Sequence, residues 1–80
     1  METLTLREEL TARQTLPPPT MRKAIREAAG VTVAQVAREI GVTRQAVVFW
    51  ERGLRRPSGP YLGAYLGVLE LLRDAIEARE

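Results

Sequence analysis

Residues 32–52 have the sequence TVAQVAREIGVTRQAVVFWER, which contains the signals for two consecutive short helices. Thr32 followed by Gln35 is a capping box, in which the threonine hydroxyl and the glutamine side chain satisfy backbone N–H groups that the first turn of a helix leaves unpaired. We therefore expect the first helix to begin at Val33. Gly41 then suits the left-handed conformation that ends a helix.

The second helix is predicted to follow almost directly. Thr43 is a favourable N-cap for a helix from Arg44 to Arg52. Because only three residues separate the two helices, they must cross at a steep angle.

Apolar residues recur in both helices at about 100° per residue, the period of an α-helix. Two faces are expected to be buried, formed by Val36, Ala37 and Ile40 on the first helix and by Val47, Trp50 and Leu54 on the second. With Val47 facing inward, the residues that point outward are Gln45, Val48, Phe49 and Arg52.

Polar and basic residues on the outer face of the second helix are typical of a helix-turn-helix motif that binds DNA. Arg44 and Gln45 lie in its first turn, where arginine can pair with guanine O6 and N7 and glutamine with adenine N6 and N7. A solvated helix face is the alternative for both. Phe49, and less strongly Val48, can pack on a thymine methyl. The alternative for Phe49 is burial against Leu54 or the C-terminal helix.

Other residues near the motif suit contacts to phosphates. Three arginines crowd the end of the second helix and the loop after it, namely Arg52, Arg55 and Arg56. Such charges add affinity that carries little sequence information. Thr43 can touch a phosphate while it caps its helix, and the backbone N–H groups near Thr32 and Val33 offer another anion site.

The segment from Met21 to about Leu72 resembles the lambdoid Cro and C1 repressor family, also known as the XRE-type helix-turn-helix family. The residues that carry the likeness are Arg26, Thr32, Ala37, Gly41, Val47, Trp50, Glu51-Arg52-Gly53 and Arg55-Arg56-Pro57. The resemblance implies a basic five-helix domain that binds operator DNA, with the helix from Arg44 in the major groove and the following loop on phosphates. It also implies an ion pair between Arg26 and Glu51, and a bidentate arginine suits a carboxylate that is costly to bury alone.

The composition restricts the class of protein. Eighty residues correspond to one small domain, and 45% hydrophobic content is enough for one helical core. The absence of cysteine and histidine argues against disulfides and Cys/His zinc sites. We expect no cofactor. No glycine-rich phosphate loop or metal-ligand spacing supports an enzyme. Neither a membrane span nor a signal peptide is predicted, so we expect a cytoplasmic or nucleoid protein.

The net charge is only +2, but it is unevenly distributed. Residues 41–56 carry +3, from four arginines and one glutamate, whereas residues 70–80 carry −2, from four acidic residues and two arginines. A polyanion is therefore attracted to the second helix and its loop. A composition rich in Arg, Ala, Val and Gly, with a single lysine, favours a GC-rich bacterium or its phage.

More helices are predicted before the motif. A short helix from Leu6 to Gln14 precedes Pro17-Pro18-Pro19, which is favoured as a stiff spacer over a ligand for a proline-binding partner. Thr20 is the expected N-cap of a helix from Met21 to Ala29 that ends at Gly30. Its inward residues are expected to be Ala24, Ile25 and Ala28.

One long helix is predicted after the motif. Either Ser58 or Gly59 can cap it, with Pro60 in its first turn. Its apolar pattern continues to Ile76, although the glycines weaken it enough to allow a bend or break near Gly67. We therefore expect an all-α, compact five- to six-helix domain, with residues 1–19 as an N-terminal helix and Pro-rich spacer and residues 20–80 as the helix-turn-helix domain.

Together these features predict a sequence-specific double-stranded DNA-binding regulator, a repressor of phage or bacterial type that needs no small-molecule ligand. The alternative is an antitoxin or an interaction subunit of a larger regulatory complex, with the C-terminal helix as its docking surface. Residues 61–76 can supply a homodimer interface. They can equally fold back on the N-terminal helix and leave a monomer.

Overall fold

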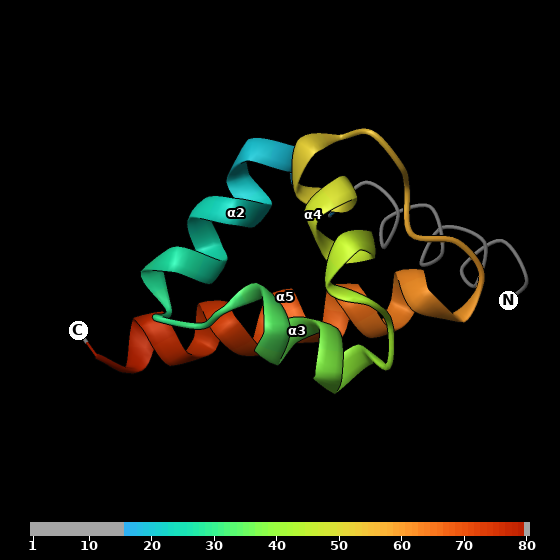
Figure 1. Cartoon of the computed structure of the whole chain (residues 1–80). Coiled ribbons are helices and arrows are strands. Elements are labelled where there is room, and N and C mark those ends of the chain that lie inside the picture. Colours follow the sequence, from blue (N-terminus) through green and yellow to red (C-terminus); the bar gives the residue numbers. More distant parts are fainter. Residues whose placement is uncertain (1–15, 80) are drawn as a thin grey trace, which may run out of the picture.

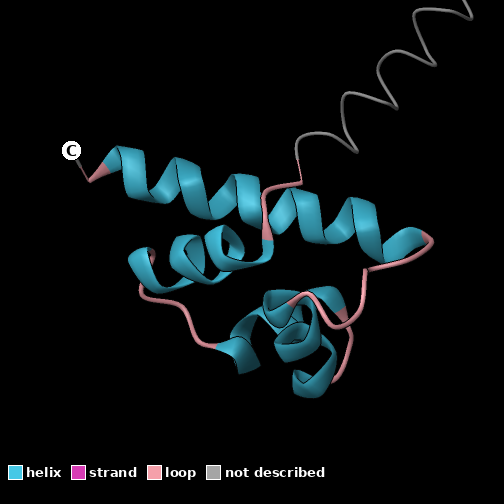
Figure 2. Cartoon of the chain, turned by 90° about the horizontal axis from the view of Figure 1, so that it is seen from above, coloured by secondary structure: helices cyan, strands magenta, loops and turns pink. Residues whose placement is uncertain are grey.

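The computed structural model describes residues 16–79 and is all-α in that range (Figure 1). It contains four helices, α2 (Pro19–Ala28), α3 (Val33–Ile40), α4 (Arg44–Arg52) and α5 (Pro60–Ala78). Helix α5 runs along one edge of the domain, and the three shorter helices lie on one side of it (Figure 2). None of these four helices has the length and apolarity that a bilayer crossing requires.

The number of helices in residues 16–79 is lower than the five to six expected for the chain. The helix predicted from Leu6 to Gln14 lies outside the described residues. The C-terminal region forms one continuous helix, without the break that the glycines allowed near Gly67. Burial of Tyr65, Leu69 and Leu72 on one face of α5 outweighs the weak helix propensity of the glycines.

Helices α3 and α4 have the predicted bounds because both are defined by side-chain caps. Gln35 N donates to the Thr32 hydroxyl at 3.1 Å, and Thr32 N donates to Gln35 Oε1 at 2.8 Å, which completes the capping box. Ala46 N donates to the Thr43 hydroxyl at 3.1 Å. Gly41 ends α3 with a φ of 88°, in the left-handed region.

Helix α2 differs from its prediction at both its start and its inward face. It begins at Pro19 with Pro18 as N-cap, so Thr20 lies inside the helix and makes no cap. A proline fits there because the first helical N–H has no intrahelical acceptor. Ile25 is buried as expected, but Ala24 and Ala28 are exposed.

The buried residues of α2 are instead Arg22 and Ile25, followed by Ala29 at its C-cap. A prediction based on apolar residues alone missed this face because one of its members is an arginine. That arginine is buried with its hydrogen-bonding groups engaged, as described below.

The core is centred on Val47 of α4 and Tyr65 of α5, both fully buried. Trp50 packs on Tyr65 with ring centroids 4.8 Å apart, so its core assignment is confirmed. Leu54 was wrongly expected in this core and is 63% exposed. It follows Gly53, whose φ of 73° ends α4 and turns the chain away before Leu54 can continue the buried face.

Helix α5 begins at Pro60 with Gly59 as N-cap, one of the two alternatives left open by the sequence. At its other end, Arg79 donates to the carbonyls of Ala28 and Ala29 at 3.3 and 3.2 Å. These are carbonyls that the end of α2 leaves unpaired within the helix. Arg79, the C-cap residue of α5, therefore ties α5 to the end of α2.

Replacing Gly53 should test how tightly the end of α4 is packed. Gly53 and Gly41 both have positive φ, but only a Cβ at Gly53 would meet a neighbour, Pro19 Cγ at 3.0 Å. We expect Gly41→Ala to cost about 1 kcal/mol from backbone strain and Gly53→Ala to cost more than about 2 kcal/mol. Urea denaturation followed by circular dichroism measures both, and equal losses would contradict the packing argument.

Candidate nucleic-acid interface

The outer face of α4 is polar at its start and only partly apolar further on. Arg44 and Gln45 are exposed in the first turn, and Arg52 is exposed in the last. Val48 and Phe49 are half-buried, so they are less outward than the helical period suggested. Within this outer face, the side chains most open to solvent are therefore polar or basic.

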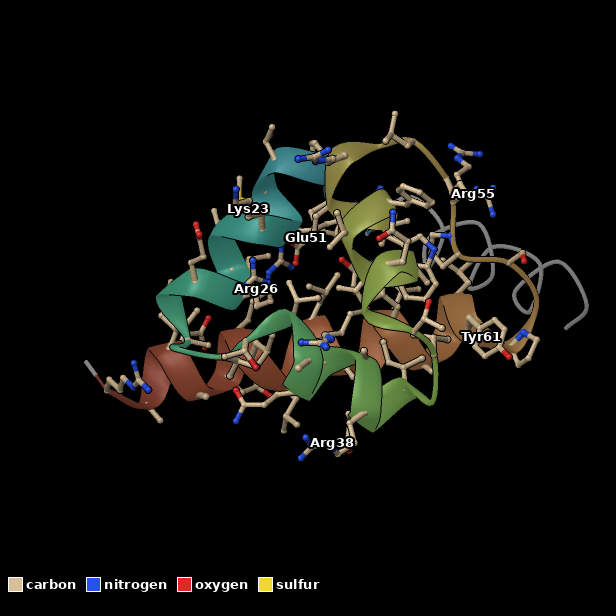
Figure 3. The ribbon with its side chains drawn as sticks, in the orientation of Figure 1. Lys23, Arg26, Arg38, Glu51, Arg55 and Tyr61 are labelled. Atoms are coloured by element: carbon tan, nitrogen blue, oxygen red, sulfur yellow. The ribbon has the colours of Figure 1, made fainter. Side chains whose placement is uncertain are left out.

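A groove of about 340 Å³ lies between α4, the loop after it and the start of α5. Its lining includes Gln45 and Phe49 from α4, Arg55 from the loop and Tyr61 from α5. Arg55 and Tyr61 both lie on the side of α4 away from α2 (Figure 3). Two residues of the predicted base-contacting set thus share one groove with two basic loop residues, Arg55 and Arg56.

Phe49 makes a contact that the sequence did not suggest. The Arg55 guanidinium lies over the Phe49 ring, with its central carbon 5.3 Å from the ring centroid. Leu54 does not cover Phe49 in a core, since Leu54 is itself largely exposed. An arginine over an aromatic face is attracted by the ring's negative face.

The expected phosphate-contacting residues lie at three places. Arg52, Arg55 and Arg56 are exposed around the end of α4 and its loop. Thr32 and Val33 lie at the start of α3, and Thr43 at the start of α4, where the structure uses both threonine hydroxyls as caps. Between residues 16 and 79, no three His, Cys, Asp or Glu side chains gather in a way that would hold a metal ion.

The inner side of α4 is held by a bidentate ion pair. Arg26 Nε lies 2.6 Å from Glu51 Oε2, and its Nη2 lies 3.0 Å from Oε1. Arg26 Nη1 also donates to the Val31 carbonyl at 3.0 Å. The hydrogen bond to Glu51 raises the pKa of Arg26. The pair joins α2 to α4 across the interior, as Figure 3 shows, and confirms the expected scaffold contact.

Arg22 is a buried arginine that sequence analysis missed. It is 7% exposed, and it donates from Nε to the Pro17 carbonyl at 2.7 Å and from Nη1 to the Trp50 carbonyl at 2.9 Å. Burial lowers the pKa of Arg22. Its position four residues before Arg26, on the same helical face, was a signal that could have revealed it.

Tyr65 brings a buried hydroxyl to the same region. Among the described residues, that hydroxyl has no hydrogen-bond partner. Desolvation, followed by the nearby charge of Glu51, raises the pKa of Tyr65 to about 12. The inner side of α4 thus contacts Arg22, Arg26 and Tyr65, while Arg44 and Gln45 in its first turn remain exposed.

A family model described as helix-turn-helix matches residues 23–73, which covers α3, α4 and most of α2 and α5. No curated protein and no solved structure matches the chain.

Breaking the ion pair from one side should destabilise the domain strongly. Arg26→Met leaves Glu51 buried without its partner, which typically costs about 3 to 5 kcal/mol. Adding Glu51→Leu should recover much of that loss, because an apolar pair needs no desolvation of charge. The free energy of unfolding from urea titration measures both variants, and a loss below about 1 kcal/mol for the single variant would contradict this role.

The raised pKa of Tyr65 predicts a loss of stability in alkali. Between pH 10 and 12 the unfolded chain releases the tyrosine proton while the folded chain retains it, so the free energy of unfolding falls by up to about 1.4 kcal/mol per pH unit. Tyr65→Phe should flatten this slope and, since its hydroxyl has no partner, preserve stability at neutral pH. Tyr61→Phe, at an exposed position, is the control that should keep the slope.

Proposed function

Because the chain belongs to the Cro/C1-type helix-turn-helix family, we propose that it is a sequence-specific double-stranded DNA-binding transcription regulator. The observation that carries this proposal is the asymmetry of α4. Its inner side is anchored by buried and ion-paired residues, while Arg44 and Gln45 stand exposed in its first turn. That is the position from which recognition helices contact base edges in the major groove.

Arg44 and Gln45 are the proposed base-contacting pair, with Phe49 and Val48 as apolar neighbours for a thymine methyl. Arg52 and Arg56 are proposed to neutralise phosphates, together with the helix starts at Thr32, Val33 and Thr43. The sequence predicts the same role for Arg55, whose guanidinium lies instead over the ring of Phe49.

Repression by occupation of an operator is the simplest regulatory mechanism for such a domain, in a bacterial or phage setting and in the cytoplasm or nucleoid. Helix α5 is a candidate homodimer surface, because Leu71 on its outer side is 61% exposed. A dimer would match operators with two half-sites about one helical turn apart.

Replacing the proposed base-contacting residues should weaken DNA binding without unfolding the protein. Selection of wild-type protein against a pool of randomised duplexes at low ionic strength would supply a preferred duplex. Arg44→Ala and Gln45→Ala should each weaken its binding by about 5- to 150-fold, the value of one bidentate base contact. Fluorescence anisotropy measures affinity, and circular dichroism checks folding.

Arg38→Ala is the matched control, since Arg38 is an exposed arginine on α3 whose side chain points away from α4 (Figure 3). It should leave the preferred duplex and its affinity nearly unchanged. A failure to enrich any duplex, or unchanged affinity for both α4 variants, would count against DNA recognition and favour a protein-interaction role.

A further inference from the structure

Arg55 is held over Phe49 by the backbone as well as by its side chain. The left-handed turn at Gly53 reverses the chain after α4. Leu54 N and Arg55 N then donate to the Phe49 carbonyl at 2.9 and 3.5 Å. The loop is thus fastened to the residue whose ring the Arg55 guanidinium covers at 5.3 Å. A side chain positioned in this way is pre-organised before any ligand arrives.

The stacked guanidinium keeps its hydrogen-bonding capacity. An arginine carries five N–H donors around the edge of its plane, so contact through one face leaves the edge free. In three other arginines the side-chain N–H groups donate to protein oxygens, namely Arg22, Arg26 and Arg79. Within residues 16–79, no hydrogen bond or ion pair engages the side chain of Arg55.

Arg55 differs from Arg52 in lining the groove beside α4, and from Arg56, which also lines that groove, in lying over the Phe49 ring. It lines the same groove as Gln45 and Phe49, both on the proposed base-contacting face of α4. Arg52 is exposed and does not line this groove. A residue that only neutralises a phosphate needs a positive charge. A residue that selects one base needs a guanidinium whose N–H donors are held in a fixed position.

We propose that Arg55 is a specificity-determining residue that pairs with the O6 and N7 acceptors of one guanine, and that Phe49 is its positioning residue. The inference rests on the proposed DNA-binding function and assigns one base-pair preference to the loop after α4. Guanine is the base whose major-groove edge presents two adjacent acceptors to an arginine fork.

The test uses the full chain and the duplex preferred by the wild type, together with duplexes in which each base pair is changed in turn. Arg55→Ala should remove the preference at a single G·C pair, reducing a discrimination of about 5- to 150-fold to near unity. Preferences at other positions should persist. Arg52→Ala, the matched control, should weaken all duplexes about equally and lower the slope of affinity against salt by about one ion.

Variants of Phe49 test its positioning role. Phe49→Leu keeps an apolar side chain but removes the ring face, and should lose the same guanine preference as Arg55→Ala. Combining the two should cause no further loss at that base pair, because both changes remove one contact. Phe49→Tyr keeps the ring and should restore the preference.

Two results would overturn the inference while leaving DNA recognition intact. One is an Arg55→Ala variant that weakens all duplexes equally with a lower salt slope, which marks a phosphate contact. The other is a double variant, Phe49→Leu with Arg55→Ala, whose loss of guanine preference equals the sum of the two single losses. That result would show that Phe49 does not act through Arg55. If the wild type enriches no duplex at all, the proposed function itself fails and the inference falls with it.

Discussion

The orientation of α4 depends on the buried pairing of Glu51 with Arg26. Glu51 is 8% exposed, and its carboxylate is stable in the interior only with its charge matched and its oxygens hydrogen-bonded. The bidentate arginine supplies both. This requirement fixes the rotation of α4 about its axis. Any other rotation of α4 would separate Glu51 from Arg26 or expose Trp50 to solvent. The same rotation presents Arg44 and Gln45 to solvent, so the proposed binding face follows from an interaction on the opposite side of the helix.

Much of the fold could be predicted because its central helices are defined by local chemistry. The caps at Thr32 and Thr43 and the turn at Gly41 act within a few residues, so α3 and α4 were placed correctly. The errors arose where distant contacts decide. Helix α5 passes unbroken through Gly67 because its buried face is covered by other helices, and Arg22 is inside because carbonyls far apart in the sequence accept from it.

In the candidate site, too, features set by local sequence could be predicted and features set by distant contacts could not. Exposure of Gln45 followed from the helical period with Val47 buried, and exposure of Arg44 followed from its place at the start of the helix. The half-burial of Phe49 did not, because it depends on a loop that returns over the ring after Gly53. Sequence alone grouped Arg55 with its basic neighbours, because a sequence shows the charge of Arg55 but not its position over the Phe49 ring.

The two hydrogen bonds from Arg79 to the end of α2 couple the stability of two helix ends that are far apart in the sequence. Residues 74–79 lie beyond the part matched by the helix-turn-helix model, yet their last arginine caps the carbonyls of Ala28 and Ala29. Fraying of the final turn of α5 would expose those carbonyls, and loosening of α2 would release the arginine. Thermal opening of the last turn of α5 is thereby coupled to opening at the end of α2.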